Sequence, residues 1–326
     1  NFIVLSKEIP ELSDYTEANM RAELASFHGV LVSSPKLVNF FSEHNIHSKI
    51  HLFPPTMPAQ NCLDHLEIPE KAKDVTRIGF MGGAHRQNDF TKFVLPAIAR
   101  LAKDHAVELV IGGNHRISID DYPSLKIYQF PYDTSYRLAL GRMQSANIDI
   151  LIHSGSATQN NPYKTHNMLL NAWALKAIPV LSNQPPYENI KELGLGILCE
   201  AADVDEWHKN LEIVMSHSGL TAQLQENLHQ YVTENYSGKQ NLEVLKVIDQ
   251  ECLTPGIAVI ENRFRVYLDR VERGISRSEA LNPVLTQGGS WLTAYLRRNR
   301  SWLLPTNSLQ ERLARLRPVR EGVPHP

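Results

Sequence analysis

Residues 77–89 read RIGFMGGAHRQND, a short apolar run that passes through two glycines into a segment with helix-capping side chains. The run at 77–81 predicts a strand, and Asn88 or Asp89 is predicted to cap a helix that ends near Lys103. A strand, a glycine turn and a helix in this order are typical of the first unit of a Rossmann-like domain.

Downstream of this unit, apolar runs continue to alternate with longer amphipathic segments as far as Asp249. The apolar runs predict five further strands, at residues 107–111, 125–130, 148–153, 178–182 and 196–199. The amphipathic segments predict helices at 165–176, opened by Thr165, at 204–217, capped by Asp203, and at 220–236 and 240–250. The alternation predicts an α/β fold with a mainly parallel, Rossmann-like sheet.

The segment upstream of this region also has an α/β pattern, with strands predicted at 29–33 and 49–53 and helices at 15–27 and 35–44. It is too short for a complete Rossmann domain, so we interpret it as the end of a preceding domain. We therefore expect three parts: residues 1–75, closing that domain and ending in a linker, a ligand-binding domain at 76–250, and a helical tail at 251–326.

The composition of the 326-residue chain, 42% hydrophobic and 21% charged, is typical of a globular protein. Cys62, Cys199 and Cys252 lie far apart, which predicts neither a disulfide framework nor a zinc site. No apolar run approaches the roughly 18 residues that cross a bilayer. We therefore expect a soluble, cytoplasmic protein.

The tail differs in charge from the rest of the chain. From residue 257 onward it has twelve arginines, six acidic residues and no lysine. Trp291, Tyr295 and Trp302 lie among these arginines, so an amphipathic helix here could contact the inner face of an anionic membrane or pack against a preceding domain. A simple solvated helical face is an equal alternative. The arginines match no nucleic-acid recognition motif, so we expect no nucleic-acid partner.

Glycine-rich loops follow two of the predicted strands. In open α/β sheets, ligands bind beyond the carboxyl ends of the strands, where backbone amides can approach a phosphate. Gly82 and Gly83 suit such an approach, and Arg86 could add a charge-assisted contact. A tight turn with a solvent-facing arginine is the alternative. For the next loop, 112–114, a simple turn is the favoured interpretation.

Residues 160–167 read NNPYKTHN and lead into a predicted helix. A lysine and a hydroxyl at a helix N-terminus suit a diphosphate, so Lys164 and Thr165 are candidate ligands. Asn167 and Asn171 are four residues apart and could hydrogen-bond ribose or sugar hydroxyls from one face. Alternatively, Lys164 is an ordinary surface lysine and Asn171 bonds solvent.

Several motifs, taken in order, resemble the donor-binding domain of the family 4 (group 1) glycosyltransferases of GT-B fold. They are GVLVSSP at 29–35, RIGFMGG at 77–83, the stretch 164–182, PYENI at 186–190 and Trp207. The resemblance covers roughly residues 29–249. It implies a nucleotide diphosphate sugar as donor, a saccharide or lipid-linked acceptor, a role in polysaccharide biosynthesis, retention of anomeric configuration, and no metal or other cofactor.

The resemblance also implies which residues hold the donor. Contacts to the diphosphate are expected from Gly82, Gly83, His85, Arg86, Lys164 and Thr165. Contacts to the nucleotide or sugar are expected from Gly113, Asn114, Phe130, Tyr132, Asn160, Asn161, Tyr163, Asn167 and Asn171. The catalytic residues are not identified and are expected in a preceding N-terminal part.

The sequence departs from the family pattern at two positions. The family has two glutamates eight positions apart, and the matching residues here are Tyr163 and Asn171. Asparagine can bond a diol but supplies no charge. A catalytically silent binding or scaffold module of a larger glycan-synthesis protein is therefore the alternative to an active transferase.

Other chemistries lack their sequence patterns. His85, His115, His153 and His166 follow strand ends, but no HxxxH pair or carboxylate accompanies them on one helix, which argues against a metal site. The residues around Ser154 do not form a nucleophile elbow, and the loop at 82–86 is not a P-loop.

Overall fold

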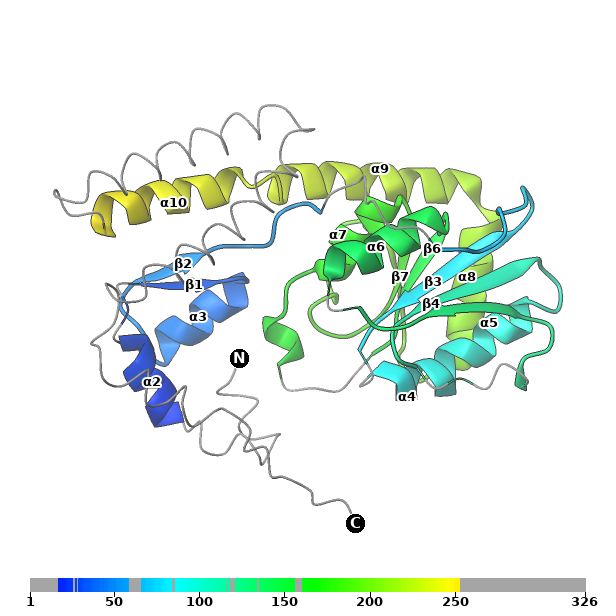
Figure 1. The fold of residues 1–326 in the computed structure, drawn as a ribbon, viewed down its shortest axis with the longest axis horizontal. Coiled ribbons are helices and arrows are strands. Elements are labelled where there is room, and N and C mark those ends of the chain that lie inside the picture. The colour runs from blue at the N-terminus through cyan, green and yellow to red at the C-terminus, as the bar shows by residue number, and fades with distance from the viewer. Residues whose placement is uncertain are drawn as a thin grey trace, which may run out of the picture. The chain divides into compact units, whose positions relative to one another are not determined.

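The computed structural model describes residues 17–25, 27, 29–58, 66–83, 86–115, 117, 121–133, 135–155 and 160–252 (Figure 1). Of the predicted features, His85 and nearly all of the arginine-rich tail lie outside these residues. Among the described residues, no helix is long and apolar enough to cross a membrane.

A six-stranded parallel sheet forms the centre of the larger part. Its strands, in chain order, are β3 Thr76–Met81, β4 Val107–Gly112, β5 Lys126–Phe130, β6 Ile150–His153, β7 Ile178–Ser182 and β8 Ile197–Cys199. Their spatial order is β5-β4-β3-β6-β7-β8, and every neighbouring pair is parallel. This is the Rossmann strand order, in which the chain direction across the sheet reverses between β3 and β6. The predicted fold class is confirmed.

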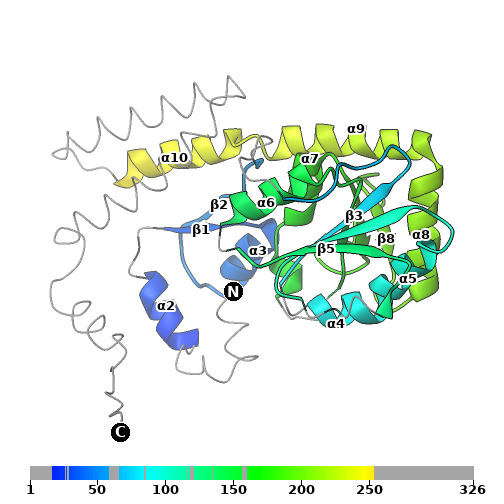
Figure 2. The same ribbon diagram turned by 45° about the vertical axis from the view of Figure 1, so that its right-hand side comes forward.

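Helices cover both faces of this sheet (Figures 1 and 2). One face packs against α5 Leu95–Leu101 and α8 Val204–Ser216, which bury Ile98 and Trp207 beside Ile150 and Ile152 of β6. The other packs against α6 Tyr136–Ser145, α7 Asn167–Leu175 and α9 Ser218–Asn235, beside Leu151. Side chains of successive strand residues thus point to opposite faces of the sheet and pack in two different hydrophobic cores, as the pleat of a strand requires. Each such buried side chain stabilises the fold by roughly 1.5–3 kcal/mol.

The helix after β3 begins earlier than predicted. A short helix, α4 Gln87–Asp89, continues through a π-helical turn, Phe90–Val94, into α5, so Asn88 and Asp89 lie inside the first turn. The predicted caps are wrong because the Arg86 amide already bonds the Gly83 carbonyl at 3.0 Å, and Arg86 has helical dihedral angles. Capping side chains act from an extended residue, which this tight turn does not provide.

Two further helix starts test the capping predictions. Asp203 caps α8 as predicted, since its carboxylate accepts a bond of 2.9 Å from the Glu206 amide. Thr165 does not open α7: the cap position is His166, and the Thr165 hydroxyl donates to the Asn167 side chain at 2.7 Å. The α6 helix was not predicted. Its sequence, YRLALGRMQS, contains a glycine that weakens the helical pattern.

The N-terminal part has its own small sheet. It comprises α2 Glu17–Ala25, β1 Val30–Val32, α3 Pro35–Glu43 and β2 Ile50–Leu52, and β1 pairs with β2 in parallel. Ser34 caps α3 by accepting from the Leu37 amide at 3.2 Å. The last helix of the described residues, α10 Lys239–Cys252, touches β2. The division at residues 75 and 250 stays a prediction.

The amino edge of the large sheet, where the strands begin, carries a buried ion network. The Arg77 guanidinium donates to the Glu108 carboxylate at 2.7 Å, and both side chains are nearly inaccessible to solvent. Asp149 accepts from the Arg77 amide at 2.7 Å and from the Lys71 ammonium at 2.6 Å. The remaining Arg77 donors bond the Ala146 and Pro69 carbonyls. Buried charges need such complete pairing, so this edge is structural.

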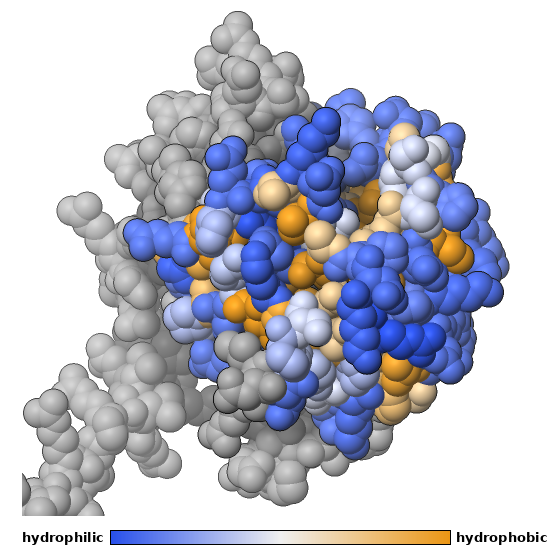
Figure 3. Space-filling view, turned by 90° about the vertical axis from the view of Figure 1, so that its right-hand side faces the viewer, coloured by the Kyte–Doolittle hydropathy of each residue, from blue (hydrophilic) through white to orange (hydrophobic). Residues whose placement is uncertain are grey.

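On the face of the sheet-containing part seen in Figure 3, hydrophilic residues predominate and surround apolar areas that gather near the centre of the face.

Candidate functional site

The candidate residues gather at the carboxyl edge of the six-stranded sheet, opposite the ion network. Gly82 and Gly83 directly follow β3, Gly113 and Asn114 follow β4, and the loop before α7 follows β6. Because β3 and β6 are neighbours at the reversal of strand order, their loops flank the crevice where open α/β sheets bind ligands.

Arg86 links the two sides of this crevice. Its Nη1 donates to the Ser154 carbonyl at 2.8 Å, and the Ser154 hydroxyl donates back to the Arg86 carbonyl at 3.1 Å. The side chain is largely buried, and this desolvation lowers the pKa of Arg86, against an opposing effect of Tyr187. Arg86 is therefore not the solvent-facing residue of the simple turn interpretation. It ties the loop after β3 to the loop after β6.

The turn before α7 is held by asparagines. Asn161–Tyr163 forms a short 3-10 helix, and Asn160 and Asn161 are buried. The Lys164 ammonium donates to Asn161 Oδ1 at 2.7 Å. Lys164 is half-buried, so it differs from an ordinary surface lysine.

His166 anchors the start of α7 to neighbouring segments. Its Nε2 lies 2.9 Å from the Pro186 carbonyl, which can only accept, so Nε2 carries the hydrogen. Nδ1 then accepts from the Tyr231 hydroxyl at 3.3 Å. Burial lowers the pKa of His166, which keeps the imidazole neutral near pH 7.

Asn167 and Asn171 differ in their surroundings although they are one turn apart. Asn167 is exposed, whereas Asn171 is only 5% exposed. The Tyr136 hydroxyl donates to Asn171 Oδ1 at 2.5 Å. The alternative in which Asn171 bonds solvent on an exposed face is therefore wrong, because α6 packs over it.

The remaining candidates are partly surface and partly core. Tyr132 is 63% exposed, and its amide donates to Asn114 Oδ1 at 3.0 Å. Phe130 is buried, with its ring so close to Gly112 that a Cβ there would lie 2.5 Å from it. The Phe130 ring thus packs against the start of the loop that carries Gly113 and Asn114.

Tyr163 contacts the N-terminal part. Its carbonyl accepts from the Ser34 hydroxyl at 2.7 Å, and its ring meets Phe40 edge-on, with centroids 5.1 Å apart. Tyr163, which stands where the family resemblance leads us to expect a glutamate, therefore packs against α3.

The structure adds residues that were not among the expected donor contacts. Ser154 bonds Arg86, Tyr231 bonds His166, and the Tyr187 ring lies beside the His166 ring with centroids 5.9 Å apart. His115 bonds the Gly82 carbonyl at 2.9 Å. Ser154 and His115 lie in loops after strands, which the sequence shows, but only the fold brings Tyr187 and Tyr231 near. No group of three or more His, Cys, Asp or Glu residues in the described part of the chain could hold a metal ion.

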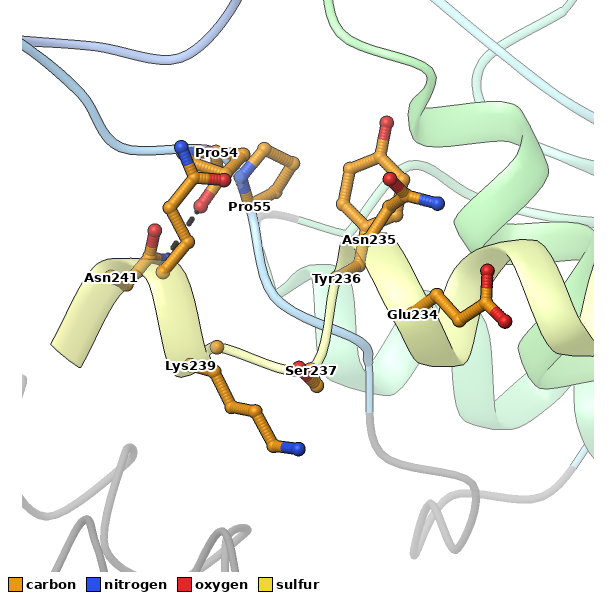
Figure 4. Close-up of a pocket in the computed structure, with 10 residues that line it drawn as sticks. Pro54, Pro55, Glu234, Asn235, Tyr236, Ser237, Lys239 and Asn241 are labelled. Atoms are coloured by element: carbon orange, nitrogen blue, oxygen red, sulfur yellow. Dashed lines mark hydrogen bonds between the residues drawn. The ribbon is translucent and has the colours of Figure 1, made fainter. Parts of the chain in front are cut away.

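A cavity of about 140 Å³ lies elsewhere, at the junction of α9 and α10 (Figure 4). Pro54 and Pro55 close one side of it, and the Asn241 side chain donates to the Pro54 carbonyl at 2.8 Å. None of the candidate donor-site residues lines this cavity. It lies between the segment that follows β2 and the junction of α9 and α10.

Comparison with known structures agrees with this architecture. The chain is similar to WaaG, a glycosyltransferase involved in lipopolysaccharide biosynthesis, at 14% identity and a TM-score of 0.52 over 77% of this chain and 70% of that one. It is also similar to a sucrose-phosphate synthase from Thermosynechococcus elongatus, at 12% identity and a TM-score of 0.51 over 77% of this chain and 66% of that one.

The chain has a GT-B glycosyltransferase-like fold. The expected resemblance is thus confirmed for the fold, and the chain spans about two thirds of the length of these two proteins. No family model and no curated protein matches the sequence.

Proposed function

We propose that this chain contains the nucleotide-sugar-binding half of a glycosyltransferase. The donor diphosphate lies in the crevice between the loops after β3 and β6, facing the start of α7. The observation that carries the proposal is the combination of a GT-B-like fold with a glycine loop and Lys164 at its carboxyl edge. Backbone amides and a lysine at a helix N-terminus suit a diphosphate.

These residues would serve the leaving group of the transfer. An acceptor hydroxyl oxygen bonds the anomeric carbon as the bond from that carbon to the diphosphate oxygen breaks, and the hydroxyl proton passes to a base. Negative charge develops on the diphosphate, where fixed amides and cations stabilise it. The cations here are Arg86, which donates to the Ser154 carbonyl, and Lys164, which donates to the amide oxygen of Asn161.

The finer features belong to the same proposal. Retention of configuration, a saccharide or lipid-linked acceptor and a role in polysaccharide biosynthesis follow from the family resemblance. A cytoplasmic location and a membrane contact through the arginine-rich tail stay predictions, as does the absence of a metal or other cofactor.

A catalytically silent binding module is the second candidate function, and the two altered glutamate positions favour it. Neither Tyr163 nor Asn171 has a carboxylate to offer a donor. Tyr163 packs against Phe40, and Asn171 is buried under Tyr136. Assays with a panel of nucleotide sugars separate the candidates. Donor hydrolysis or transfer would exclude the silent module, and nucleotide binding without turnover would support it.

A thermal-shift experiment tests the proposed site. We expect UDP or GDP to raise the melting temperature and Lys164→Ala to abolish the rise, while the free variant melts slightly lower because Asn161 loses its bond from Lys164. Lys126→Ala is the matched control, because this exposed lysine lies on β5 at the amino edge. An unchanged nucleotide shift in Lys164→Ala would remove Lys164 from the site.

A further inference from the structure

The loops after β3 and β4 and the end of strand β5 are joined by side-chain hydrogen bonds at the carboxyl edge. The side-chain amide of Gln129, a residue near the end of β5, donates from Nε2 to the carbonyls of Gly113 at 3.1 Å and His115 at 2.8 Å. His115, in the loop after β4, contacts the Gly82 carbonyl after β3 at 2.9 Å. Gln129 therefore braces the loop that carries His115, and His115 holds the glycine loop.

The approach of these loops depends on glycine at position 113. Gly113 has a φ of +128°, which L side chains rarely adopt. A Cβ there would lie 2.9 Å from His115 Nε2 and 3.0 Å from the Gly82 carbonyl oxygen. Gly113 thus leaves the space in which the contact between His115 and Gly82 forms.

The contact places a hydrogen on Nε2 of His115. A carbonyl only accepts, so Nε2 carries the hydrogen that bonds Gly82. The His115 side chain is buried beside the Phe80 ring, with centroids 5.0 Å apart. The Phe80 ring and the bond to Gly82 together hold the imidazole in its place.

The direction of the Gly82 carbonyl determines where the next amide points. In a planar trans peptide the C=O and the following N–H point in opposite directions. The Gly82 carbonyl faces the loop after β4, on one side of β3, so the Gly83 N–H faces the β6 side. That side is the crevice, where Arg86 meets Ser154. Within the described part of the chain, no residue accepts the Gly83 hydrogen.

We propose that His115, braced by Gln129, is a positioning residue that aims the Gly83 N–H at the diphosphate of the donor. The inference rests on the proposed function and adds to it a residue that touches no donor atom. Without this bond, the peptide group between Gly82 and Gly83 could rotate and turn the Gly82 carbonyl toward the phosphate. The negative phosphate and the carbonyl oxygen would then repel each other. His115 prevents this by bonding the carbonyl on the opposite side.

Binding measurements on His115 variants of the full chain test the proposal. His115→Leu fills similar space but cannot donate, whereas the amide nitrogen of His115→Gln can reach the Nε2 position and donate. We expect His115→Leu to weaken UDP or GDP binding about tenfold, the loss of one charge-assisted hydrogen bond, and His115→Gln to stay within about threefold of wild type. Titration calorimetry gives these dissociation constants.

The nucleosides uridine and guanosine, measured by ligand-observed NMR, distinguish positioning from general damage. They lack phosphate, so their affinity should not change in His115→Leu. Equal loss of nucleoside and diphosphate binding, or no loss at all, would overturn the role of His115. A wild-type protein that binds neither UDP nor GDP would instead overturn the proposed function and, with it, this inference.

A second variant keeps the test decisive if His115→Leu does not fold. Gln129→Met leaves His115 in place but removes both bonds that brace its loop. We expect diphosphate binding to fall about threefold, with nucleoside binding unchanged. Diphosphate binding at the wild-type level in a folded Gln129→Met protein would contradict the bracing role.

Discussion

The two edges of the same six-stranded sheet use different chemistry. At the amino edge, charges are matched with charges, as in the pairs of Arg77 with Glu108 and Lys71 with Asp149. At the carboxyl edge, neutral carbonyls accept the bonds that hold the glycine loop and the start of α7: His115 bonds Gly82, and His166 bonds Pro186. An ion pair at this edge, between Arg142 of α6 and Asp133 after β5 at 3.3 Å, lies outside these contacts. The amino edge is thus joined by buried ion pairs, whereas the glycine loop and the start of α7 are held mainly by bonds to neutral groups.

The largest effect is expected from breaking the ion network. Arg77→Met leaves the Glu108 carboxylate buried with the exposed Lys126, 3.7 Å away, and a long bond of 3.4 Å from the Tyr128 hydroxyl, and should lower the free energy of unfolding by about 3 kcal/mol. Urea denaturation measures this loss. Arg77→Met combined with Glu108→Met should recover most of it, because no unpaired charge remains. An equally unstable double variant would show that packing, not charge, dominates this edge.

A smaller effect is expected from filling the space between the glycine loops. Gly113→Ala forces a side chain into a positive φ and against Gly82, which should cost about 1–3 kcal/mol of stability and weaken nucleotide binding. Gly219→Ala is the control, since no atom lies within 4 Å of a Cβ there. That change, within α9, should raise stability by up to about 1 kcal/mol. Similar losses in the two variants would contradict this interpretation of the loop.

The neutral histidines predict a pH dependence. Burial lowers the pKa of His115 and of His166, so below about pH 6.5 the unfolded chain binds protons that the folded chain does not. Stability should fall as the pH falls below that value, by at most about 1.4 kcal/mol per pH unit for each histidine, and their contribution should be constant above it. Urea denaturation at pH 7.5 and 5.5 measures the fall. It should be smaller in a double variant with His115→Gln and His166→Gln, and an equal fall would assign the pH dependence to other groups.

Most strands of the large sheet could be predicted from the sequence because they are buried runs rich in β-branched and aliphatic residues, as in β4, β6 and β7. Residues 178–182 match β7 at both ends. Helix starts were harder to predict from the sequence, since a cap depends on the backbone dihedral angles as well as on the residue type. Asp203 has the required extended backbone, whereas Arg86 is already helical, and so the caps predicted after it failed.

The site was predictable as a set of loops but not as a set of contacts. The sequence places glycines and Lys164 after strands whose carboxyl ends share one edge. It does not reveal that Asn171 lies under Tyr136, because α6, which supplies that tyrosine, has no clear helical pattern. Nor does it show that Arg86 turns inward to Ser154, 68 residues away along the chain.

Hydrogen exchange measured by mass spectrometry, with and without UDP or GDP, tests most directly whether the carboxyl edge is the donor site. We predict slower exchange in peptides that cover residues 81–86 and 160–168, including the Gly83 amide, and no change in peptides that cover 66–76 at the amino edge. Nucleotide-dependent protection at the amino edge, or protection that leaves both carboxyl-edge loops unchanged, would contradict the account.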